Sequence, residues 1–173
     1  LVKEYIGTDS DIVPFAVPEV RVTDSLRKES EGIWNSLNRD NSKKPLRLIM
    51  VGALSFIKGQ DIFADAIYKL PKEVTDNINI IFCYGSDEKD NSYDTLVEIM
   101  DNLSKYISVK VFDSLPHDEM LSLISTADFL IVSSRQETMS AVTAEAWMTG
   151  TPAVLSDACG ISYYAKEEMR KLI

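Results

Sequence analysis

The stretch DFLIVSSRQETMSAVTAEAWMTGTPAVLSD, residues 128–157, contains a complete strand–helix–strand unit. Its beginning, residues 128–134, is a short apolar run of the kind expected for a strand buried on both faces. Residues 140–149 then have the composition of a packed helix, which Gly150 closes. A second apolar run covers residues 152–157. Two buried strands joined by a helix are typical of parallel pairing, so this stretch predicts an α/β sheet.

The same alternation extends over most of the chain from residue 45 onward. Apolar runs of strand length are followed by segments whose apolar residues recur at helical spacing. The further expected strands are residues 45–52, 77–85 and 108–113, and the further expected helices are residues 58–70, 95–107, 116–127 and 164–172. This order predicts a Rossmann-like, doubly wound parallel sheet with helices on both faces.

The first 44 residues differ from the rest. Pro14 and Pro18 lie among apolar residues, which favours short extended pieces over the first 23 positions. Asp24 is the expected N-cap of a helix that runs to Asp40. We therefore interpret residues 1–44 as an inter-domain lead-in and residues 45–173 as one domain. The chain starts without methionine and stops in a charged segment, so we expect it to be a fragment of a longer protein.

Composition excludes several classes of function. The chain has 173 residues, of which 45% are hydrophobic and 26% are charged, as in one ordinary globular domain. Its net charge of −9 leaves no basic footprint for nucleic acid. Cys83 and Cys159 do not make a disulfide framework, which favours a cytoplasmic setting. No apolar run in these residues has transmembrane length, and we expect no signal peptide among them.

The loop after the first expected strand reads VGALSFIKGQD and contains one candidate for anion binding. In open parallel sheets, ligands bind at the carboxyl ends of the strands. This loop has neither the P-loop spacing nor the dinucleotide fingerprint. Gly52 permits a tight turn, and Lys58 stands where a helix begins, so its amine and the helix N–H groups suit phosphate oxygens. From these residues alone, a surface lysine is the simpler interpretation.

A second candidate is the loop RQETMS, which follows the strand of the opening stretch. Ser140 is the expected N-cap of the next helix, and the first backbone N–H groups of that helix offer an anion site. Glu137 lies in the loop and Glu145 lies inside the helix, and carboxylates accept hydrogen bonds from sugar hydroxyls. The alternative, a loop glutamate and a solvated helix glutamate, stays open, although the alanines around Glu145 are unusual for a free surface.

Other chemistries find little support in the chain. His117 is the only histidine, and its place in the first turn of a helix predicts an exposed side chain without a catalytic role. No cluster has metal-ligand spacing, and no GxSxG motif accompanies Ser133 or Ser134. A phosphoacceptor receiver domain would need acidic residues where the first strand ends, but the chain has MVGAL there.

The motifs in these loops resemble the C-terminal, donor-binding domain of retaining glycosyltransferases of the GT-B fold, in group 1 or family four. The match runs from about Pro45 to Gly160. VGALSFIKGQDIFADAI is similar to the family's glycine, lysine–glycine and alanine opening, and ETMSAVTAE fits its E-x7-E motif. FDSLPHDEMLSLISTADFLIVSSRQE and AWMTGTPAVLSD resemble the segments before and after that motif. These loosely spaced pieces occur in the family's order.

The resemblance implies a role for individual residues. Glu137 would bind the transferred sugar and Lys58 the donor diphosphate, and these two are the expected catalytic residues. Glu145 would bind the ribose hydroxyls. The remaining expected contacts are to the diphosphate or the base, and they involve Gly52, Ala53, Ser114, Leu115, Met139, Ser140 and Ala141.

The sequence departs from the family at the expected diphosphate site. Ala53 stands where the family usually has arginine, which removes a cation. Thr138 and Ser140 stand where it usually has glycines, so a ligand has less room to approach the backbone. Arg135 is a candidate substitute cation.

The function implied by the resemblance is that of a hexosyltransferase of polysaccharide biosynthesis. It would use a nucleoside-diphosphate sugar as substrate, with retention and with neither a cofactor nor a metal. The acceptor would be a glycan or a lipid-linked molecule, and an N-terminal domain of the same chain would be needed for turnover, so the fragment alone would be inactive. A full-length protein attached to the inner membrane face is compatible with this interpretation. A non-catalytic nucleotide-binding or scaffold domain is the alternative. The base, the sugar and the acceptor stay open.

Overall fold

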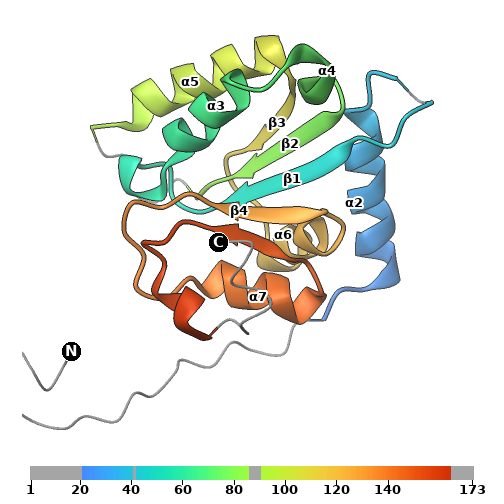
Figure 1. Ribbon diagram of the computed structural model, residues 1–173. Helices are drawn as coiled ribbons and strands as arrows, with labels where there is room; N and C mark the ends of the chain where they lie inside the picture. Colours follow the sequence, from blue (N-terminus) through green and yellow to red (C-terminus); the bar gives the residue numbers. More distant parts are fainter. Residues whose placement is uncertain (1–20, 41, 86–90, 165–173) are drawn as a thin grey trace, which may run out of the picture.

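The computed structural model describes residues 21–40, 42–85 and 91–164, and its centre is a parallel five-stranded sheet (Figure 1). The strands lie in the order β3-β2-β1-β4-β5, and every neighbouring pair is parallel. Their bounds are Leu46–Val51 for β1, Ile78–Cys83 for β2, Ser108–Phe112 for β3, Phe129–Val132 for β4 and Ala153–Leu155 for β5. Since the chain adds strands first on one side of β1 and then on the other, the topological switch point lies between β1 and β4.

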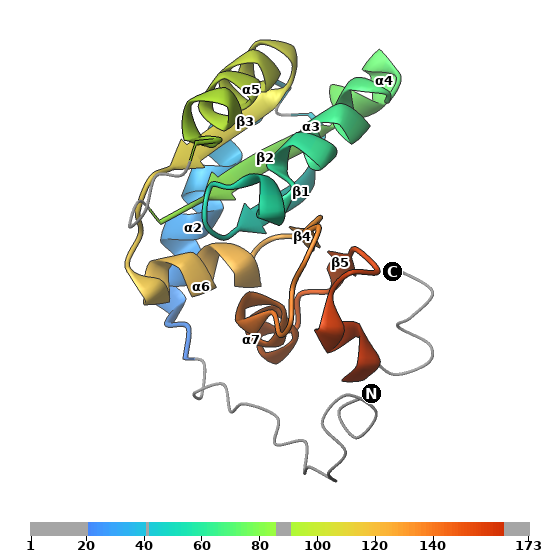
Figure 2. The same cartoon turned by 90° about the vertical axis from the view of Figure 1, so that its left-hand side faces the viewer.

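Helices cover both faces of the sheet, as Figures 1 and 2 show. One face packs against α3 and α5, and the other against α2, α6 and α7. The helix bounds are Asp24–Ser36 for α2, Gln60–Tyr68 for α3, Lys72–Thr75 for α4, Tyr93–Tyr106 for α5, His117–Ser125 for α6 and Ala141–Thr149 for α7. The 3-10 helices η1 and η2 cover Phe56–Lys58 and Gly160–Tyr164. The predicted Rossmann-like fold is confirmed.

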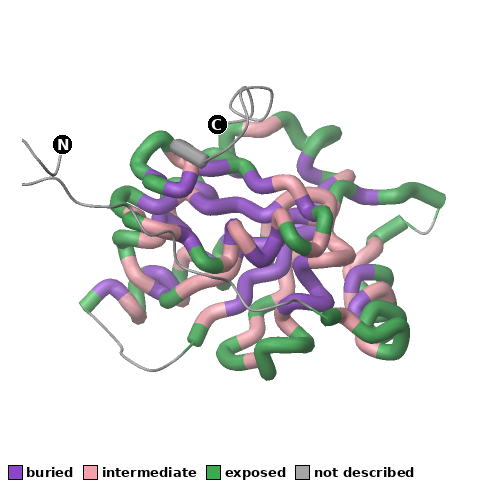
Figure 3. The backbone as a smooth tube through the Cα atoms, turned by 90° about the horizontal axis from the view of Figure 1, so that it is seen from below, coloured by how far each residue is buried: buried purple, intermediate pink, exposed green. Residues whose placement is uncertain are grey.

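The alternating side chains of the central strands build two cores, one on each side of the sheet. Leu48 and Met50 of β1 face α3 and α5, whereas Ile49 between them faces the opposite helices. All six residues of β2 are buried. In Figure 3 the buried backbone accordingly runs through the middle of the molecule, and exposed backbone lies at its periphery. Apolar runs without polar alternation are expected for strands covered on both faces.

The structure corrects two details of the predicted helices. Residues 58–70 do not form one helix, because Gly59 adopts a left-handed φ of 74° that ends η1 before α3 begins. The N-cap of α2 is Thr23 and not Asp24, since the Thr23 hydroxyl accepts the N–H of Leu26 at 3.3 Å. The predicted extended pieces before residue 21 and nearly all of the predicted helix 164–172 lie outside the described residues.

Helix α2 packs closely on the rest of the domain. Trp34 is fully buried, and its indole N–H donates to Thr126 Oγ1 at 3.2 Å. Ser30 Oγ donates to Ser122 Oγ of α6 at 2.8 Å. A boundary at residue 44 would separate these partners, although the boundary itself stays a prediction. Among the described helices, none combines the length and the apolar character needed to cross a bilayer.

Candidate functional site

The candidate site lies where the loops after β1 and β4 meet, at the switch point of the sheet. A pocket of about 240 Å³ opens between these loops. Its walls come from the ends of the two strands, from the loops and from the start of α7, and the lining residues that the sequence singled out are Gly52, Lys58, Glu137, Met139, Ser140 and Ala141. This is the region where open α/β sheets bind ligands.

Lys58 and Glu137 form an ion pair inside this pocket. Lys58 Nζ lies 2.5 Å from Glu137 Oε2, and the two side chains are only 30% and 14% exposed. Gly52 lies beneath the aliphatic stem of Lys58, because a Cβ added there would be 3.7 Å from the lysine Cδ. The structure therefore brings together the two residues that sequence reasoning placed at one site, although they are 79 positions apart.

The two loops are held against each other beside this pair. Gly59, directly after Lys58, passes so close to β4 that an added Cβ would lie 2.1 Å from the Ser133 carbonyl oxygen. Ser133 Oγ in turn donates to the Gly59 carbonyl at 2.7 Å. Together with its positive φ, this contact means that only glycine fits position 59.

The N-terminus of α7 forms another wall of the pocket. Ser140 is the N-cap, as predicted, and it is 3% exposed. Its hydroxyl oxygen accepts the N–H of Thr143 at 3.4 Å and the Thr143 hydroxyl at 2.7 Å. The first N–H groups of a helix have no partner within the helix and carry partial positive charge, so this wall favours an anion.

The loop around Glu137 is also fixed from its far side. Glu137 pairs with Cys159 in an isolated parallel bridge, with Glu137 N donating to Ala158 O at 3.3 Å and Gly160 N donating to Glu137 O at 2.9 Å. Gly160 approaches Thr138 so closely that an added Cβ would lie 2.3 Å from its carbonyl oxygen. The segment after β5 therefore supports the backbone that presents Glu137.

Glu145 lies outside the pocket and contacts a residue that sequence reasoning set aside. It is buried in α7, at 8% exposure, and its Oε1 lies 2.8 Å from His117 Nε2 at the start of α6. Since a carboxylate oxygen accepts hydrogen bonds, the contact forms in the imidazole tautomer whose Nε2 carries the proton. The His117 side chain is 62% exposed, as predicted, yet it is a direct partner of a candidate site residue. Its place at the carboxyl end of a strand was the signal that could have identified it.

A second pocket, of about 250 Å³, adjoins the first. Ala53, Ser114 and Leu115 line it, and Val51 and Gly52 form walls of both pockets. Burial raises the pKa of the Cys83 thiol in its wall to about 12. Burial, followed by a hydrogen bond with Tyr93, raises the pKa of Tyr84 to about 12 as well. Both side chains stay neutral near pH 7 and add no charge to this wall.

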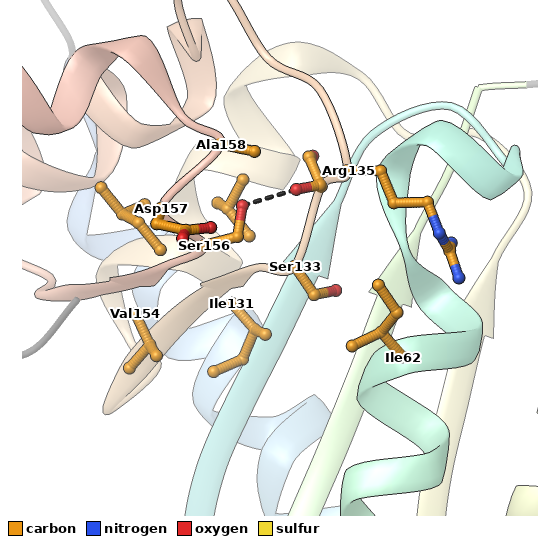
Figure 4. Close-up of a pocket in the computed structure, with 11 residues that line it drawn as sticks. Ile62, Ile131, Ser133, Arg135, Val154, Ser156, Asp157 and Ala158 are labelled. Carbon is orange, nitrogen blue, oxygen red and sulfur yellow. Dashed lines mark hydrogen bonds between the residues drawn. The ribbon is translucent and has the colours of Figure 1, made fainter.

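Arg135 does not line the pocket that contains Lys58 and Glu137. Its guanidinium pairs with both carboxylate oxygens of Asp61, at 2.8 and 2.7 Å. It borders a different cavity, of about 440 Å³, between Ile62 of α3 and Val154 of β5 (Figure 4). The pair holds the pKa of Asp61 below its usual value and that of Arg135 above it. The structure thus places Arg135 outside the pocket for which it was the candidate cation.

Among the residues that the structure describes, no group of three or more histidine, cysteine, aspartate or glutamate side chains could hold a metal ion. The expected independence from metals and cofactors stays a prediction.

Comparison with known proteins places the chain in a broad class. The family model described as "Glycosyl transferases group 1" matches residues 34–173. The D-inositol 3-phosphate glycosyltransferase of Corynebacterium aurimucosum is 28% identical over 112 residues, which are 64% of this chain and 27% of that protein. The protein of the same name from Corynebacterium diphtheriae is 26% identical over 115 residues, 66% of this chain and 27% of that one. The chain thus spans about a quarter of the length of these relatives.

Solved structures share the fold. WaaG, a glycosyltransferase involved in lipopolysaccharide biosynthesis, matches with a TM-score of 0.70 and 22% identity over 94% of this chain and 42% of that one. A UDP-forming α,α-trehalose-phosphate synthase from Burkholderia xenovorans matches with a TM-score of 0.63 and 15% identity, over 91% and 43% of the two chains. At these identities the likeness concerns the fold alone.

Proposed function

Because the chain belongs to the group 1 glycosyl transferases, we propose that this domain binds a nucleoside-diphosphate sugar for retaining transfer to an acceptor. The observation that carries the proposal is the ion pair of Lys58 and Glu137 beside the N-terminus of α7. It puts one cation, one carboxylate and one helix N-terminus around a single pocket.

Lys58 and α7 are suited to a diphosphate. The lysine amine supplies a full positive charge, and the helix N-terminus supplies aligned N–H groups. When a donor enters, the amine would turn from Glu137 to the phosphate oxygens. Departure of the diphosphate builds negative charge on the leaving group, which the same two features would stabilise. Ala53 adds no charge to this site, so Lys58 would be its principal cation.

Glu137 would accept hydrogen bonds from the hydroxyls of the transferred sugar. Its backbone is paired with the segment after β5, which suits a group that must hold a substrate in one orientation. The neighbouring pocket shares Val51 and Gly52 with the first and has a neutral wall, so an elongated ligand with an anionic part and an uncharged base would fit the pair of pockets. To bind the ribose hydroxyls, the Glu145 carboxylate would have to accept hydrogen bonds from the ligand as well as from His117.

The remaining parts of the proposal concern the full-length protein. The acceptor, a glycan or a lipid-linked molecule, would be bound largely by an N-terminal domain of the same chain. We therefore expect this domain alone to bind the donor without turnover, and we expect no requirement for a metal. A cytoplasmic location, with peripheral attachment at the inner membrane face, fits such a reaction.

The alternative is a domain that binds a nucleotide without catalysis. Ala53, at the position where the family usually has arginine, is the observation that favours it. Turnover by the full-length protein with a sugar donor would decide between the two, because only the enzyme would release a nucleoside diphosphate in an acceptor-dependent manner.

Calorimetry with UDP, GDP, ADP and their sugar derivatives tests the donor site. We expect one nucleoside diphosphate to bind, and Lys58→Met to weaken it at least tenfold, since about 1.5–3 kcal/mol accompanies a hydrogen bond to a charged group. Glu137→Gln should leave the diphosphate affinity unchanged or higher, because it frees the lysine, while it abolishes turnover in the full-length protein. The absence of binding by all of these nucleotides at millimolar concentration would exclude the donor site.

A further inference from the structure

We propose that Arg135 is a positioning residue that locks the turn after β1 onto the loop after β4, and so holds Lys58 at the donor. The inference rests on the proposed function, because it concerns the same site. Arg135 N donates to Ile57 O at 2.7 Å, and its Nη1 donates to Phe56 O at 2.6 Å. Its guanidinium also forms the two-pronged ion pair with Asp61 at the start of α3.

The turn that carries Lys58 has little else to hold it. It is a single 3-10 turn of three residues, which is too short to be stable by itself. Its apolar side chains do not anchor it, since Phe56 is 43% and Ile57 is 55% exposed. The turn therefore depends on polar contacts to its backbone. Besides those from Arg135, the structure gives the bond from Phe56 N to Ser92 Oγ at 3.3 Å and a long contact from Ser133 Oγ to Lys58 O at 3.5 Å.

Arginine is suited to this task where lysine is not. Its planar guanidinium donates to the Phe56 carbonyl and to both oxygens of Asp61 at once, a geometry that a point charge does not reproduce. It also lies 6.0 Å from the centre of the Phe56 ring. Figure 4 shows the side chain reaching toward α3 and away from Ser156 and Asp157. Exposed ion pairs add little stability. The main effect of the contact between Arg135 and Asp61 is therefore on the position of the turn that carries Lys58.

The contacts of Arg135 determine where Lys58 lies. Arg135 holds the two residues before Lys58, and Ser133 holds the residue after it. Glu137, two positions beyond Arg135, then meets the lysine amine on the other side of the loop. A bound diphosphate would draw that amine away from Glu137, and at that moment the backbone contacts would keep the lysine in place. A displacement of about 1 Å can cost a site about 100-fold in rate.

Comparison of the affinities for a nucleoside diphosphate and for the matching monophosphate distinguishes a positioning role of Arg135 from a general structural role. Arg135→Gln and Asp61→Asn should each lower the affinity for UDP, GDP or ADP, whichever binds, by about tenfold. The matching nucleoside monophosphate should bind unchanged, because Lys58 is assigned to the diphosphate. The loss should disappear in a Lys58→Met background. Lys69→Ala, which breaks the exposed pair of Lys69 with Asp65, is the matched control and should bind like the wild type.

Amide hydrogen exchange tests the same inference without a ligand. The N–H groups of Lys58 and Gly59 donate to Ser55 and Phe56 within the turn. In Arg135→Gln their exchange should speed up by about tenfold or more, while buried strand amides stay unchanged. Should Arg135→Gln fail to fold, Asp61→Asn carries the test, since it removes only the partner charge.

The two proposals fail in different ways. If the wild type binds no nucleoside diphosphate, the donor site is lost, and the exchange rates alone decide the role of Arg135. If the diphosphate binds but Arg135→Gln weakens the monophosphate equally, or acts fully in the Lys58→Met background, the positioning role is overturned. Unchanged exchange at Lys58 and Gly59 would overturn it as well.

Discussion

At the scale of single residues, the contact between His117 and Glu145 links a histidine without an expected role to a candidate ligand-binding carboxylate. A buried carboxylate needs partners, and the imidazole supplies one at 2.8 Å while its ring stays largely exposed. If Glu145 binds the ribose hydroxyls, His117 orients the carboxylate toward them. A residue that the sequence presents as an ordinary helix start then becomes part of the ligand site.

Nucleotides with and without a 2′-hydroxyl test this role. His117→Ala should reduce the preference for a ribonucleoside diphosphate over its 2′-deoxy analogue severalfold, because Glu145 loses its orienting donor. His117→Gln, whose amide N–H₂ also donates, should preserve part of the preference. Calorimetry with the two nucleotides measures the ratio. Equal preference in the wild type and His117→Ala would contradict the assignment.

We expect substitution of glycine by alanine to have opposite effects on stability at Gly59 and at Gly32. Gly59→Ala introduces a Cβ 2.1 Å from the Ser133 carbonyl at a φ of 74°, so it should destabilise the protein by about 3 kcal/mol or more. Gly32 lies on the exposed side of α2 with no atom within 4 Å of an added Cβ. Gly32→Ala should therefore stabilise by about 0.5–1 kcal/mol. Urea unfolding of both variants measures the two effects.

At the scale of elements, α3 is joined to the loop after β4 by the ion pair of Asp61 and Arg135, whose strength depends on pH. The pKa of Asp61 is lowered chiefly by its hydrogen bond with Arg135 and further by the charge of that arginine. A carboxylate with a lowered folded-state pKa stabilises the fold above its unfolded pKa, and that contribution is lost as the pH falls through the folded value.

Comparison of the wild type with Asp61→Asn isolates this contribution. Near pH 6 the wild type should be more stable by no more than about 1 kcal/mol, because both partners are partly exposed. The difference should shrink as the pH falls below about 4. Unfolding free energies between pH 3 and pH 6 test the sign. A difference that grows toward low pH would contradict the contribution of this pair.

At the scale of the whole molecule, α2 precedes the domain boundary predicted at residue 44, yet it packs into the core of the domain that follows. Its Trp34 is completely buried against the face that also packs α6 and α7. Cutting the chain at residue 45 should therefore expose apolar core surface, although every strand would remain.

A shortened chain of residues 45–173 should be less stable than the full chain by at least about 3 kcal/mol, the usual cost of removing a buried tryptophan. Trp34→Ala in the full chain should reproduce much of that loss. Thermal unfolding measures both. If the shortened chain unfolds at the same midpoint as the full chain, α2 contributes nothing to the domain.

Much of the fold could be predicted because its signals are local. Apolar runs and helical spacing indicated each strand of the sheet, and the ligand rule for parallel sheets indicated the loops that bear Lys58 and Glu137. The break at Gly59 was missed because the apolar spacing begins only at Ile62 and does not mark where the helix starts. The left-handed conformation of Gly59 accompanies its close approach to Ser133, directly after β4. The N-cap was missed by one residue because Thr23 and Asp24 are both favourable caps.

The amino-acid sequence by itself determined the alternation of strands and helices, and the motif order that indicated the family, because these depend on residue type and near neighbours. Only the tertiary structure decided that Arg135 forms an ion pair with Asp61, 74 positions away, and that His117 is hydrogen-bonded to Glu145, 28 positions away. Both contacts exist because β1 and β4 are neighbours in the sheet and α6 packs beside α7. Strand order and helix packing set such distances, and no local pattern encodes them.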